Sequence, residues 1–367
     1  MFSLRSILSA LVLSSLAAGA CLAQDVKGMN VGELIRALEN ENPIVRSRAA
    51  CSLGEKGQRA RPSLNALLEL LSDDTVVEYN VCEGIGRRNN WNSYRCNSKK
   101  DGCADRSPGE LASRALTELG SVSRVPLEGK LKHHSAFVRM NSAWALGALG
   151  YNQSVSPLNE AMRDSSPDVR EKSAWALGAI GNSEGVPALV GAVNDPDEDV
   201  REMTAWGMGA IGSRLSVEAL SALIVDDSPG VRENAAWALG AIGSPRAIGA
   251  LGVAAHDSDL EVRDNVAWAL GAIGSKEGVP ALITLLKNSE LDIVETAVWA
   301  LGAIGHSSGI EPLLPLLESE EPEIREQAAW SLGAIGNHRA LDALIELMED
   351  EDSEVRKMAM WAVRAVY

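Results

Sequence analysis

Tryptophan recurs along this chain at a fixed interval, and that interval limits the fold more than any other feature. Eight residues stand 31 positions apart: Trp144, Trp175, Trp206, Trp237, Trp268, Trp299, Trp330 and Trp361. Around most of them one phrase repeats, of which Ser173–Gly181 is typical, and an acidic turn with a Val-Arg pair precedes it. A period of this length predicts an array of units that bury their apolar faces on their neighbours.

Each unit has the signals of two helices. Asp and Ser residues before the Val-Arg pair suit the N-terminus of a second helix. Gly181 and its equivalents stand where a helix ends in a residue with positive φ. Pro187 and Pro280 fall in the first turn of a first helix, where a missing N–H costs nothing. The sequence therefore predicts an all-α chain of helical hairpins.

Weaker copies of the phrase occur at Ala50–Gly54 and Val81–Glu83. The repeated phrase resembles the HEAT-like repeats of the PBS-lyase type, over roughly residues 28–367. That resemblance implies a right-handed α-solenoid of about eleven hairpins of 31 residues. It is specific for the fold and says little of function, because lyases, hydroxylases and scaffolds share these repeats.

The N-terminus predicts a targeting segment. Residues 1–23 have the pattern of a signal peptide, with a short apolar run after Arg5 that is followed by small residues. Cleavage fits after Ala23 or after Ala20, and the second site leaves Cys21 as the N-terminus for a lipid anchor, as in bacterial lipoproteins. We expect a secreted or periplasmic, cell-envelope protein without a membrane span.

The remaining chain divides into three parts. Residues 24–88 predict degenerate repeats, and residues 108–367 predict regular repeats with the tryptophans. Between them, residues 89–107 are polar, contain Gly and two Cys, and stand where a first helix is expected. We interpret this segment as an inserted loop.

Disulfides are expected in a chain with a secretory signal. Cys96 and Cys103 lie close together within the inserted loop, and we predict that they are bridged. Cys51 and Cys82 occupy equivalent positions in adjacent repeats, so their Cα atoms should lie about 8–10 Å apart. A disulfide reaches only about 7 Å, which leaves Cys82 as a rival partner for either loop cysteine.

The tryptophans lie opposite the predicted core. On a helical wheel Val169, Ser173 and Leu177 share one arc, and Trp175 falls roughly 160° away. An acidic residue precedes most of the tryptophans by one turn. The predicted ligand-binding residues are Trp144, Trp175, Trp206, Trp237, Trp268, Trp299, Trp330, Glu171, Glu202, Glu233, Asp264, Glu295 and Glu326. The resemblance implies that this face lines a concave surface.

Such a groove predicts a scaffold that binds a protein or an extended peptide, of cationic character because of the acids. A glycan stacked on the indoles is an alternative ligand. In the opposing interpretation, the indoles pack on one another and stiffen the array, and the two interpretations can coexist. The runner-up functions are a bilin-lyase-like or chaperone-like enzyme of the same fold and a passive spacer.

Other chemistry is not indicated. The net charge of −16 disfavours nucleic acid, whose phosphates need a basic face. The five His follow no metal-ligand spacing, and no phosphate loop or nucleophile–base set is recognisable. We therefore predict no catalytic residue, no metal and no cofactor.

A second row of charge runs beside the core. The Val-Arg pair supplies Arg170, Arg201, Arg232, Arg263, Arg325 and Arg356, with acids near most of them. HEAT-like repeats join neighbours through stacks of Asp and Arg, so the resemblance implies a structural role for this row. Val294 replaces arginine in one repeat, where a looser interface is expected.

Overall fold

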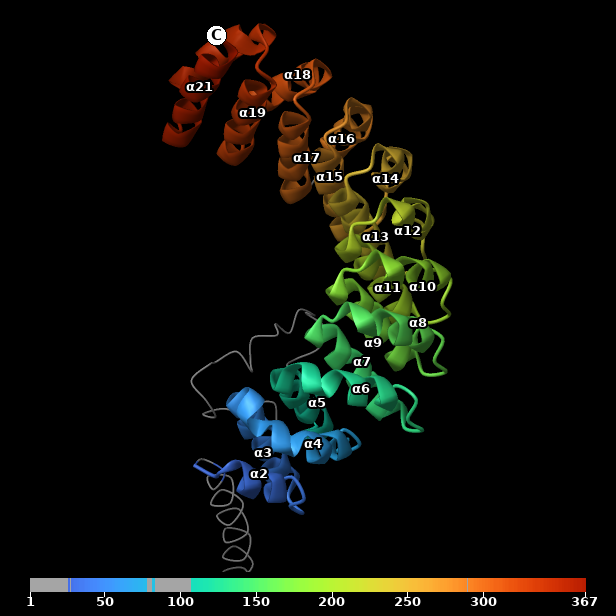
Figure 1. The fold of residues 1–367 in the computed structure, drawn as a ribbon. Coiled ribbons are helices and arrows are strands. Elements are labelled where there is room, and N and C mark those ends of the chain that lie inside the picture. Colours follow the sequence, from blue (N-terminus) through green and yellow to red (C-terminus); the bar gives the residue numbers. More distant parts are fainter. Residues whose placement is uncertain (1–25, 27, 78–80, 83–106, 289) are drawn as a thin grey trace, which may run out of the picture. The chain divides into compact units, whose positions relative to one another are not determined.

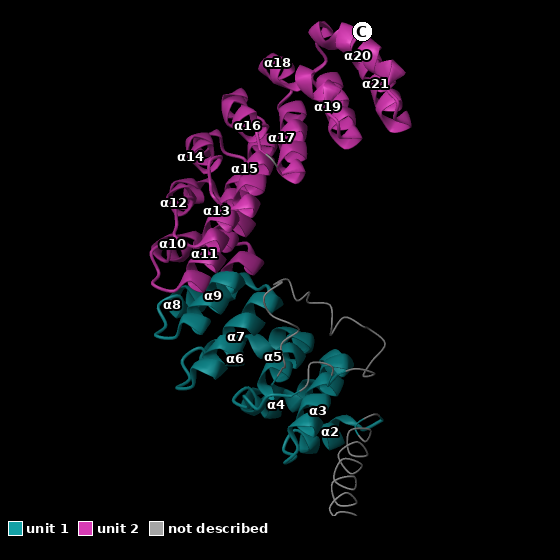
Figure 2. Cartoon of the chain, turned by 180° about the vertical axis from the view of Figure 1, so that it is seen from behind, with its two compact units in different colours: residues 1–176 teal, residues 177–367 magenta. Residues whose placement is uncertain are grey.

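The computed structural model describes residues 26, 28–77, 81–82, 107–288 and 290–367, and every regular element within them is a helix (Figure 1). The chain divides into two compact units, Met1–Ala176 (unit 1) and Leu177–Tyr367 (unit 2) (Figure 2). A shorter first helix alternates with a longer second helix from α2 to α21, which makes ten hairpins in the described residues, where about eleven were expected. The predicted all-α solenoid is confirmed.

The first helices are short and most are entered through a 3-10 turn, whereas most second helices have 14 residues. The helices up to the unit boundary are α2 (Val31–Ala37), α3 (Pro43–Lys56), α4 (Leu64–Leu70), α5 (Pro108–Leu119), α6 (Arg124–Lys130), α7 (Ala136–Leu149), α8 (Val155–Ala161) and α9 (Pro167–Ile180), which crosses it. Those of unit 2 are α10 (Val186–Gly191), α11 (Glu198–Ile211), α12 (Val217–Leu223), α13 (Pro229–Ile242), α14 (Ile248–Ala254), α15 (Leu260–Ile273), α16 (Val279–Leu285), α17 (Leu291–Ile304), α18 (Ile310–Leu313), α19 (Pro322–Ile335), α20 (Leu341–Glu346) and α21 (Ser353–Val366).

The predicted helix ends are confirmed. At the start of α11 the Asp197 side chain accepts the N–H of Val200 at 3.2 Å. At its end Gly212 adopts φ 69°, a left-handed conformation that costs a Cβ-bearing residue about 1 kcal/mol or more. Glycines equivalent to Gly181 share this conformation: Gly212, Gly243, Gly274, Gly305 and Gly336. Pro280 stands in the first turn of α16, as expected.

The core runs along one side of the second helices. In α11 the side chains of Val200, Ala205 and Met208 are fully buried. Each second helix of unit 2 packs on the next, from α11 through α13, α15, α17 and α19 to α21, and unit 1 has the same order from α3 through α5 to α7. Each fully buried Leu or Val contributes roughly 1.5–3 kcal/mol, so the array is held by its interfaces.

The interruption in unit 1 falls inside the second hairpin. Helix α5 packs against α3, α4 and α7, which is the place of a second helix. The N–H of Gly109 donates to the carbonyl of Asp73 at 2.9 Å, so the two ends of the interruption meet. Val81 and Cys82 form a turn within it. Their expected alignment with the tryptophan phrase is therefore wrong, because the second helix of this hairpin begins only at Pro108.

A disulfide joins Cys51 on α3 to Cys82, with a Cα–Cα distance of 6.0 Å. The expectation that these two residues lie too far apart is wrong, because Cys82 is not on a neighbouring helix but in a turn that reaches α3. Arg48 supports this turn by donating from Nη1 to the carbonyl of Val81 at 3.2 Å. Cys96 and Cys103 lie outside the described residues, so their bridge stays a prediction.

The predicted signal peptide at residues 1–23, including Cys21, also lies outside the described residues. Among the helices that the structure describes, none is long and apolar enough to cross a membrane.

Candidate functional site

The repeated tryptophans all lie on second helices, and the structure places them at the margin of the core rather than on a fully open face. The seven predicted residues are half-buried, and Trp361 on α21 is 44% exposed. Their helices are α7 (Trp144), α9 (Trp175), α11 (Trp206), α13 (Trp237), α15 (Trp268), α17 (Trp299) and α19 (Trp330). Each of these rings therefore has a covered part, which can contribute to packing, and an open part, which a ligand could contact.

The buried part of most of these indoles rests on a glycine of the preceding hairpin. A Cβ added to Gly209 would lie 2.7 Å from Cζ3 of Trp237, and one added to Gly240 would lie 2.6 Å from Cζ3 of Trp268. A real Cβ does not approach so closely, so only glycine lets the ring and the backbone come together. This glycine belongs to the repeated phrase of one hairpin and accommodates the tryptophan of the next.

In unit 1 the row of rings continues with a cation. The rings of Trp144 and Trp175 stack with their centroids 6.0 Å apart and an interplanar angle of 8°. Arg114 of α5 also lies over the Trp144 ring, with Cζ 5.8 Å from the ring centroid. Sequence reasoning missed Arg114 because α5 has only 12 residues and stands out of the 31-residue register. An arginine over an indole face is the stabilising cation–π geometry.

The acids one turn before the tryptophans are half-buried, and two of them in unit 2, Glu233 and Glu295, lie where their negative charge is disfavoured. Burial, followed by the nearby carboxylates of Glu261 and Glu202, raises the pKa of Glu233. Burial, followed by Asp292 and Glu323, likewise raises the pKa of Glu295. These carboxylates lie close to one another in partly dry surroundings, which disfavours their charged form.

The other acids of the row differ in their contacts. Oδ1 of Asp264 is buried and accepts no hydrogen bond. Glu202 accepts a weak hydrogen bond from Nδ2 of Asn234 at 3.4 Å and packs closely on Gly230. In unit 1, Glu171 forms an ion pair with Lys172 at 2.7 Å. A carboxylate beside an indole can attract an ammonium or guanidinium group, and unit 2 provides this pair in five successive hairpins.

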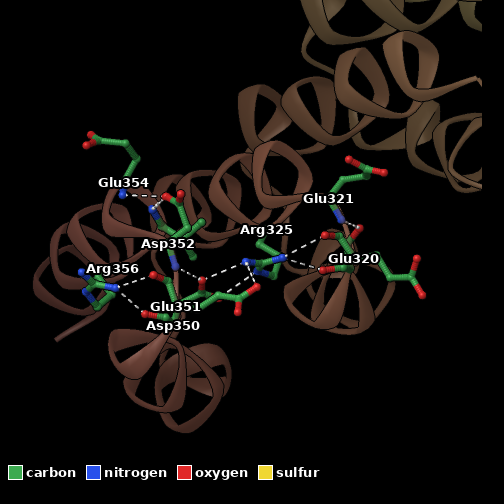
Figure 3. A network of polar contacts seen from close by, with 10 residues as sticks. Glu320, Glu321, Arg325, Asp350, Glu351, Asp352, Glu354 and Arg356 are labelled. Atoms are coloured by element: carbon green, nitrogen blue, oxygen red, sulfur yellow. Dashed lines mark hydrogen bonds and ion pairs between the residues drawn. The ribbon is translucent and has the colours of Figure 1, made fainter.

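A second row of charges joins the hairpins, as the resemblance implied. Nε and Nη2 of Arg325 donate to the two carboxylate oxygens of Asp350, both at 2.8 Å, and Nη1 donates to the carbonyl of Ser319 at 2.8 Å (Figure 3). The hydrogen bond from Arg325 holds the pKa of Asp350 below its ordinary value. The same two-pronged contact joins Arg139 to Asp164, Arg201 to Asp226 and Arg232 to Asp257.

This second row is broken over two successive hairpins rather than one. Arg263 has Asn288 at the position where Arg232 has Asp257, and its buried Nε makes no hydrogen bond. In the next hairpin Val294 replaces the arginine, as noted from the sequence. The break therefore includes a guanidinium without its carboxylate.

The two units differ in charge. Unit 2 has 12 Lys and Arg against 31 Asp and Glu, a net charge of −19, whereas unit 1 has 22 against 19, a net charge of +3.

No group of three or more His, Cys, Asp or Glu side chains among the described residues could hold a metal ion.

Solved structures with the same fold have low sequence identity. An engineered protein has 20% identity and a TM-score of 0.50 over 92% of this chain and 99% of its own. Importin beta has 14% identity and a TM-score of 0.59 over 92% of this chain and 52% of its own. The CpcE–CpcF phycocyanin lyase from Nostoc has 23% identity over 66% and 93%, with a TM-score of 0.39. The likenesses to the engineered protein and to importin beta show the fold alone.

Family models identify the repeat itself. No curated protein sequence matches the chain. The model described as HEAT repeats matches residues 157–230, 218–297 and 294–364. The model described as the PBS lyase HEAT-like repeat matches residues 138–164. With more than half of its length matched, the chain belongs to the HEAT repeat family, and its fold is a helical repeat scaffold.

Proposed function

We propose that the tryptophan row of unit 2 binds an extended, cationic segment of a protein. This row consists of Trp206, Trp237, Trp268, Trp299 and Trp330, with the acid one turn before each. The observation that carries the proposal is a half-buried indole one turn after a half-buried carboxylate, repeated on five second helices. Aromatic rings and acids together favour Lys and Arg side chains.

The electrostatics of the row support this choice. The raised pKa values of Glu233 and Glu295, caused first by burial and then by neighbouring acids, mean that ionisation is costly in the free protein. A bound ammonium or guanidinium lowers this cost, since an opposite charge nearby favours the ionised carboxylate. The net charge of −19 on unit 2 attracts cations over a longer range as well.

Spacing supports an extended ligand. Neighbouring helices pack about 8–10 Å apart, and an extended chain advances about 3.3–3.6 Å per residue. Roughly three ligand residues therefore span one hairpin, so a cationic side chain at every third position meets successive indoles.

The test is titration of the purified chain with a synthetic peptide that carries Lys at every third position, followed by tryptophan fluorescence and calorimetry. We expect binding that weakens as salt rises and that falls at least about tenfold for each acid replaced in E233Q/E295Q, because each charge-assisted contact contributes about 1.5–3 kcal/mol. Glu218→Gln is the matched control, since it removes one exposed acid of unit 2 from a first helix. Equal binding of a peptide with Glu in place of Lys contradicts the proposal.

The same experiment separates the other functions. Binding of neutral oligosaccharides with quenching of the indoles indicates a glycan ligand. A bound chromophore or turnover indicates the lyase-like or chaperone-like alternative. A chain that binds none of these probes is a spacer, in which the indoles serve only to pack on the glycines.

We also propose that the protein acts outside the cytoplasm, in a secreted or periplasmic location. The predicted signal peptide supports this, and so does the Cys51–Cys82 disulfide, because disulfides persist in oxidising compartments. Fractionation of the native cells with mapping of the N-terminus tests it and also distinguishes cleavage after Ala23 from lipidation at Cys21. A cytosolic chain with reduced Cys51 contradicts it.

A further inference from the structure

The second row of charges is interrupted in the middle of unit 2 and is complete on both sides of the interruption. Arg201 and Arg232 before it, and Arg325 after it, each donate two hydrogen bonds to a carboxylate of the next hairpin. Such a two-pronged contact fixes the orientation of two neighbouring hairpins as well as their distance. The two interfaces without it are those that join α15 to α17 and α17 to α19.

These two interfaces are held by contacts that constrain orientation less. Nη1 of Arg263 donates to the carbonyl of Asp257 in the turn before its own helix, but its buried Nε makes no hydrogen bond, and Asn288 stands in place of a carboxylate. In the next hairpin the pair is Val294 and Ser319, and Val294 is buried. Apolar packing is non-directional, so it permits a rotation that two hydrogen bonds from one guanidinium oppose.

The first helix at the second of these interfaces is also interrupted. Helices α12, α14 and α16 have seven residues, whereas α18 has only four and continues as the 3-10 turn Leu314–Glu318. Pro315 lies in this turn, and it breaks the α-helix because it has no N–H and its ring clashes with the carbonyl four residues earlier. A stretch of 3-10 helix at such a place often marks a hinge.

The C-terminal halves of the second helices, by contrast, stay in close contact. A Cβ added to Gly271 of α15 would lie 2.8 Å from Cβ of Ala300 on α17, so the two backbones approach closely. Oγ of Ser331 on α19 donates to the carbonyl of Val298 on α17 at 2.8 Å, a buried hydrogen bond between the helices. The missing contacts belong to the N-terminal ends of the same helices. Each interface is therefore fixed at one end and less constrained at the other.

We propose that unit 2 bends at the interfaces α15–α17 and α17–α19, which we call the hinge. The close contacts between the helices are its pivot, and the N-terminal ends of the helices are its moving part. Asp264, Glu295 and Glu326 directly follow the second-row positions of these helices, so they lie at the moving ends. Bending changes the separation of these three carboxylates more than the separation of the helices at the pivot. The hinge follows from the contacts alone and does not depend on the proposed function.

The test measures distances between two spin labels on the full chain by double electron–electron resonance. Genetically encoded labels leave the native cysteines unmodified. One pair, at Glu261 and Glu323, spans the hinge, and the matched pair, at Asp199 and Glu261, spans two complete interfaces; all three side chains are exposed. The labels of each pair are two hairpins apart. We expect a broader distribution of distances across the hinge than across the matched pair, and equal widths overturn the proposal.

Variants decide whether the missing contacts are the cause. N288D returns a carboxylate opposite Arg263, and V294R/S319D restores the other pair, so each should narrow the distribution across the hinge. For N288D we expect the population of long distances to fall about fivefold, as one restored pair predicts after the cost of burying its charge.

The converse variant is D257N, which copies the natural Asn288 into a complete interface and should broaden the distribution of the matched pair. Circular dichroism establishes that each variant is folded. Widths that stay unchanged in folded N288D and folded D257N overturn the proposal. No ligand takes part in these measurements, so a failure of the cationic peptide to bind contradicts the proposed function and not the hinge.

Discussion

Two rows of carboxylates run through the hairpins of unit 2, and their environments are opposite. The acids opposite the arginines, such as Asp257, accept two hydrogen bonds from a guanidinium of the preceding hairpin. Burial opposes the ionisation of Asp257, but the hydrogen bonds from Arg232 and the backbone outweigh it and keep its pKa below the ordinary value. Two acids beside the tryptophans, Glu233 and Glu295, have a raised pKa because burial and other carboxylates oppose the charge.

This difference separates the carboxylates that hold the scaffold together from those that are available to a binding partner. A carboxylate that already accepts hydrogen bonds from an arginine stabilises the fold and gains little from binding a cationic ligand. A carboxylate whose ionised form is disfavoured in the free protein is stabilised when a cation binds beside it. Unit 2 thus uses some acids, such as Asp257, in folding and places others, Glu233 and Glu295, where binding can lower the cost of their charge.

The largest expected effect comes from breaking the second row of charges, in which an arginine of one hairpin pairs with an aspartate of the next. We call this the paired row. Asp350→Ala leaves the guanidinium of Arg325, whose side chain is only 8% exposed, without its carboxylate. Removing one partner of a buried pair typically costs about 3–5 kcal/mol, and we expect a loss in this range by urea unfolding. Because the folded pKa of Asp350 is lowered, its contribution is present at neutral pH and is lost as pH falls through that pKa.

The control for this variant lies one residue away. Glu351 is 4.0 Å from Nη2 of Arg325, and its side chain is 93% exposed (Figure 3). Glu351→Ala should change the free energy of unfolding by less than about 0.5 kcal/mol, since exposed ion pairs contribute little. Equal losses from both variants would mean that the geometry of the pair does not matter.

A smaller effect is expected from removing an indole. A fully buried Trp costs about 3–5 kcal/mol when replaced by Ala, and Trp268 is half-buried, so we expect Trp268→Ala to cost about 2 kcal/mol. Trp361→Ala should cost less, because that indole is 44% exposed although it also rests on a glycine. Thermal unfolding of both variants provides the measurement. Equal costs would contradict the idea that burial sets the role of each ring.

The break in the paired row offers a repair. Asn288→Asp places a carboxylate at the position where Arg263 lacks one, and the buried Nε of Arg263 is available to donate to it. A hydrogen bond between charged groups contributes about 1.5–3 kcal/mol, and after the cost of burying the new charge we expect a gain of about 1 kcal/mol. The gain should disappear in R263M, which makes a double-mutant cycle. A gain that persists in R263M contradicts the pairing.

The period of the tryptophans predicted the hairpins and their caps, because these depend on residues a few positions apart within one repeat. The Arg–Asp contacts join residues 25 positions apart in neighbouring hairpins, and the family resemblance implied them. The second hairpin could not be predicted in this way. Its helix α5 begins only after a long insertion and is two residues shorter than most second helices, so the register fails. For the same reason the position of Cys82, and with it the disulfide to Cys51, was misplaced.

The half-burial of the indoles was also beyond the sequence pattern. A helical wheel gives the direction of a residue on its own helix, but how much of Trp237 is covered depends on the neighbouring hairpin. Gly209 there lets the ring approach its backbone. The pKa of Glu233 likewise depends on Glu202 and Glu261, which come from the preceding and the following hairpin. Contacts between repeats decide both properties.

The smallest expected effect tests Glu233, one of the acids beside the tryptophans. The change in stability should have the opposite sign to that of Asp350→Ala. Because burial and neighbouring acids raise the folded pKa of Glu233, the ionised carboxylate opposes folding at any pH above that pKa. Glu233→Gln keeps the size of the side chain and removes the charge, so Tm should rise slightly at pH 7, by the equivalent of about 0.5 kcal/mol after allowance for solvent screening. The rise should vanish below about pH 4, where Glu is protonated in both states.

Two measurements make this effect informative about function. Glu218→Gln, in the same unit but on a first helix, should leave Tm unchanged at both pH values. The cationic peptide should raise the Tm of the wild-type chain more than that of Glu233→Gln, since only the wild type has a charge for the ligand to relieve. A variant that is more stable and still binds equally well would separate the cost of Glu233 from binding. The two rows would then differ in stability alone, and the cation-binding proposal would lose its electrostatic support.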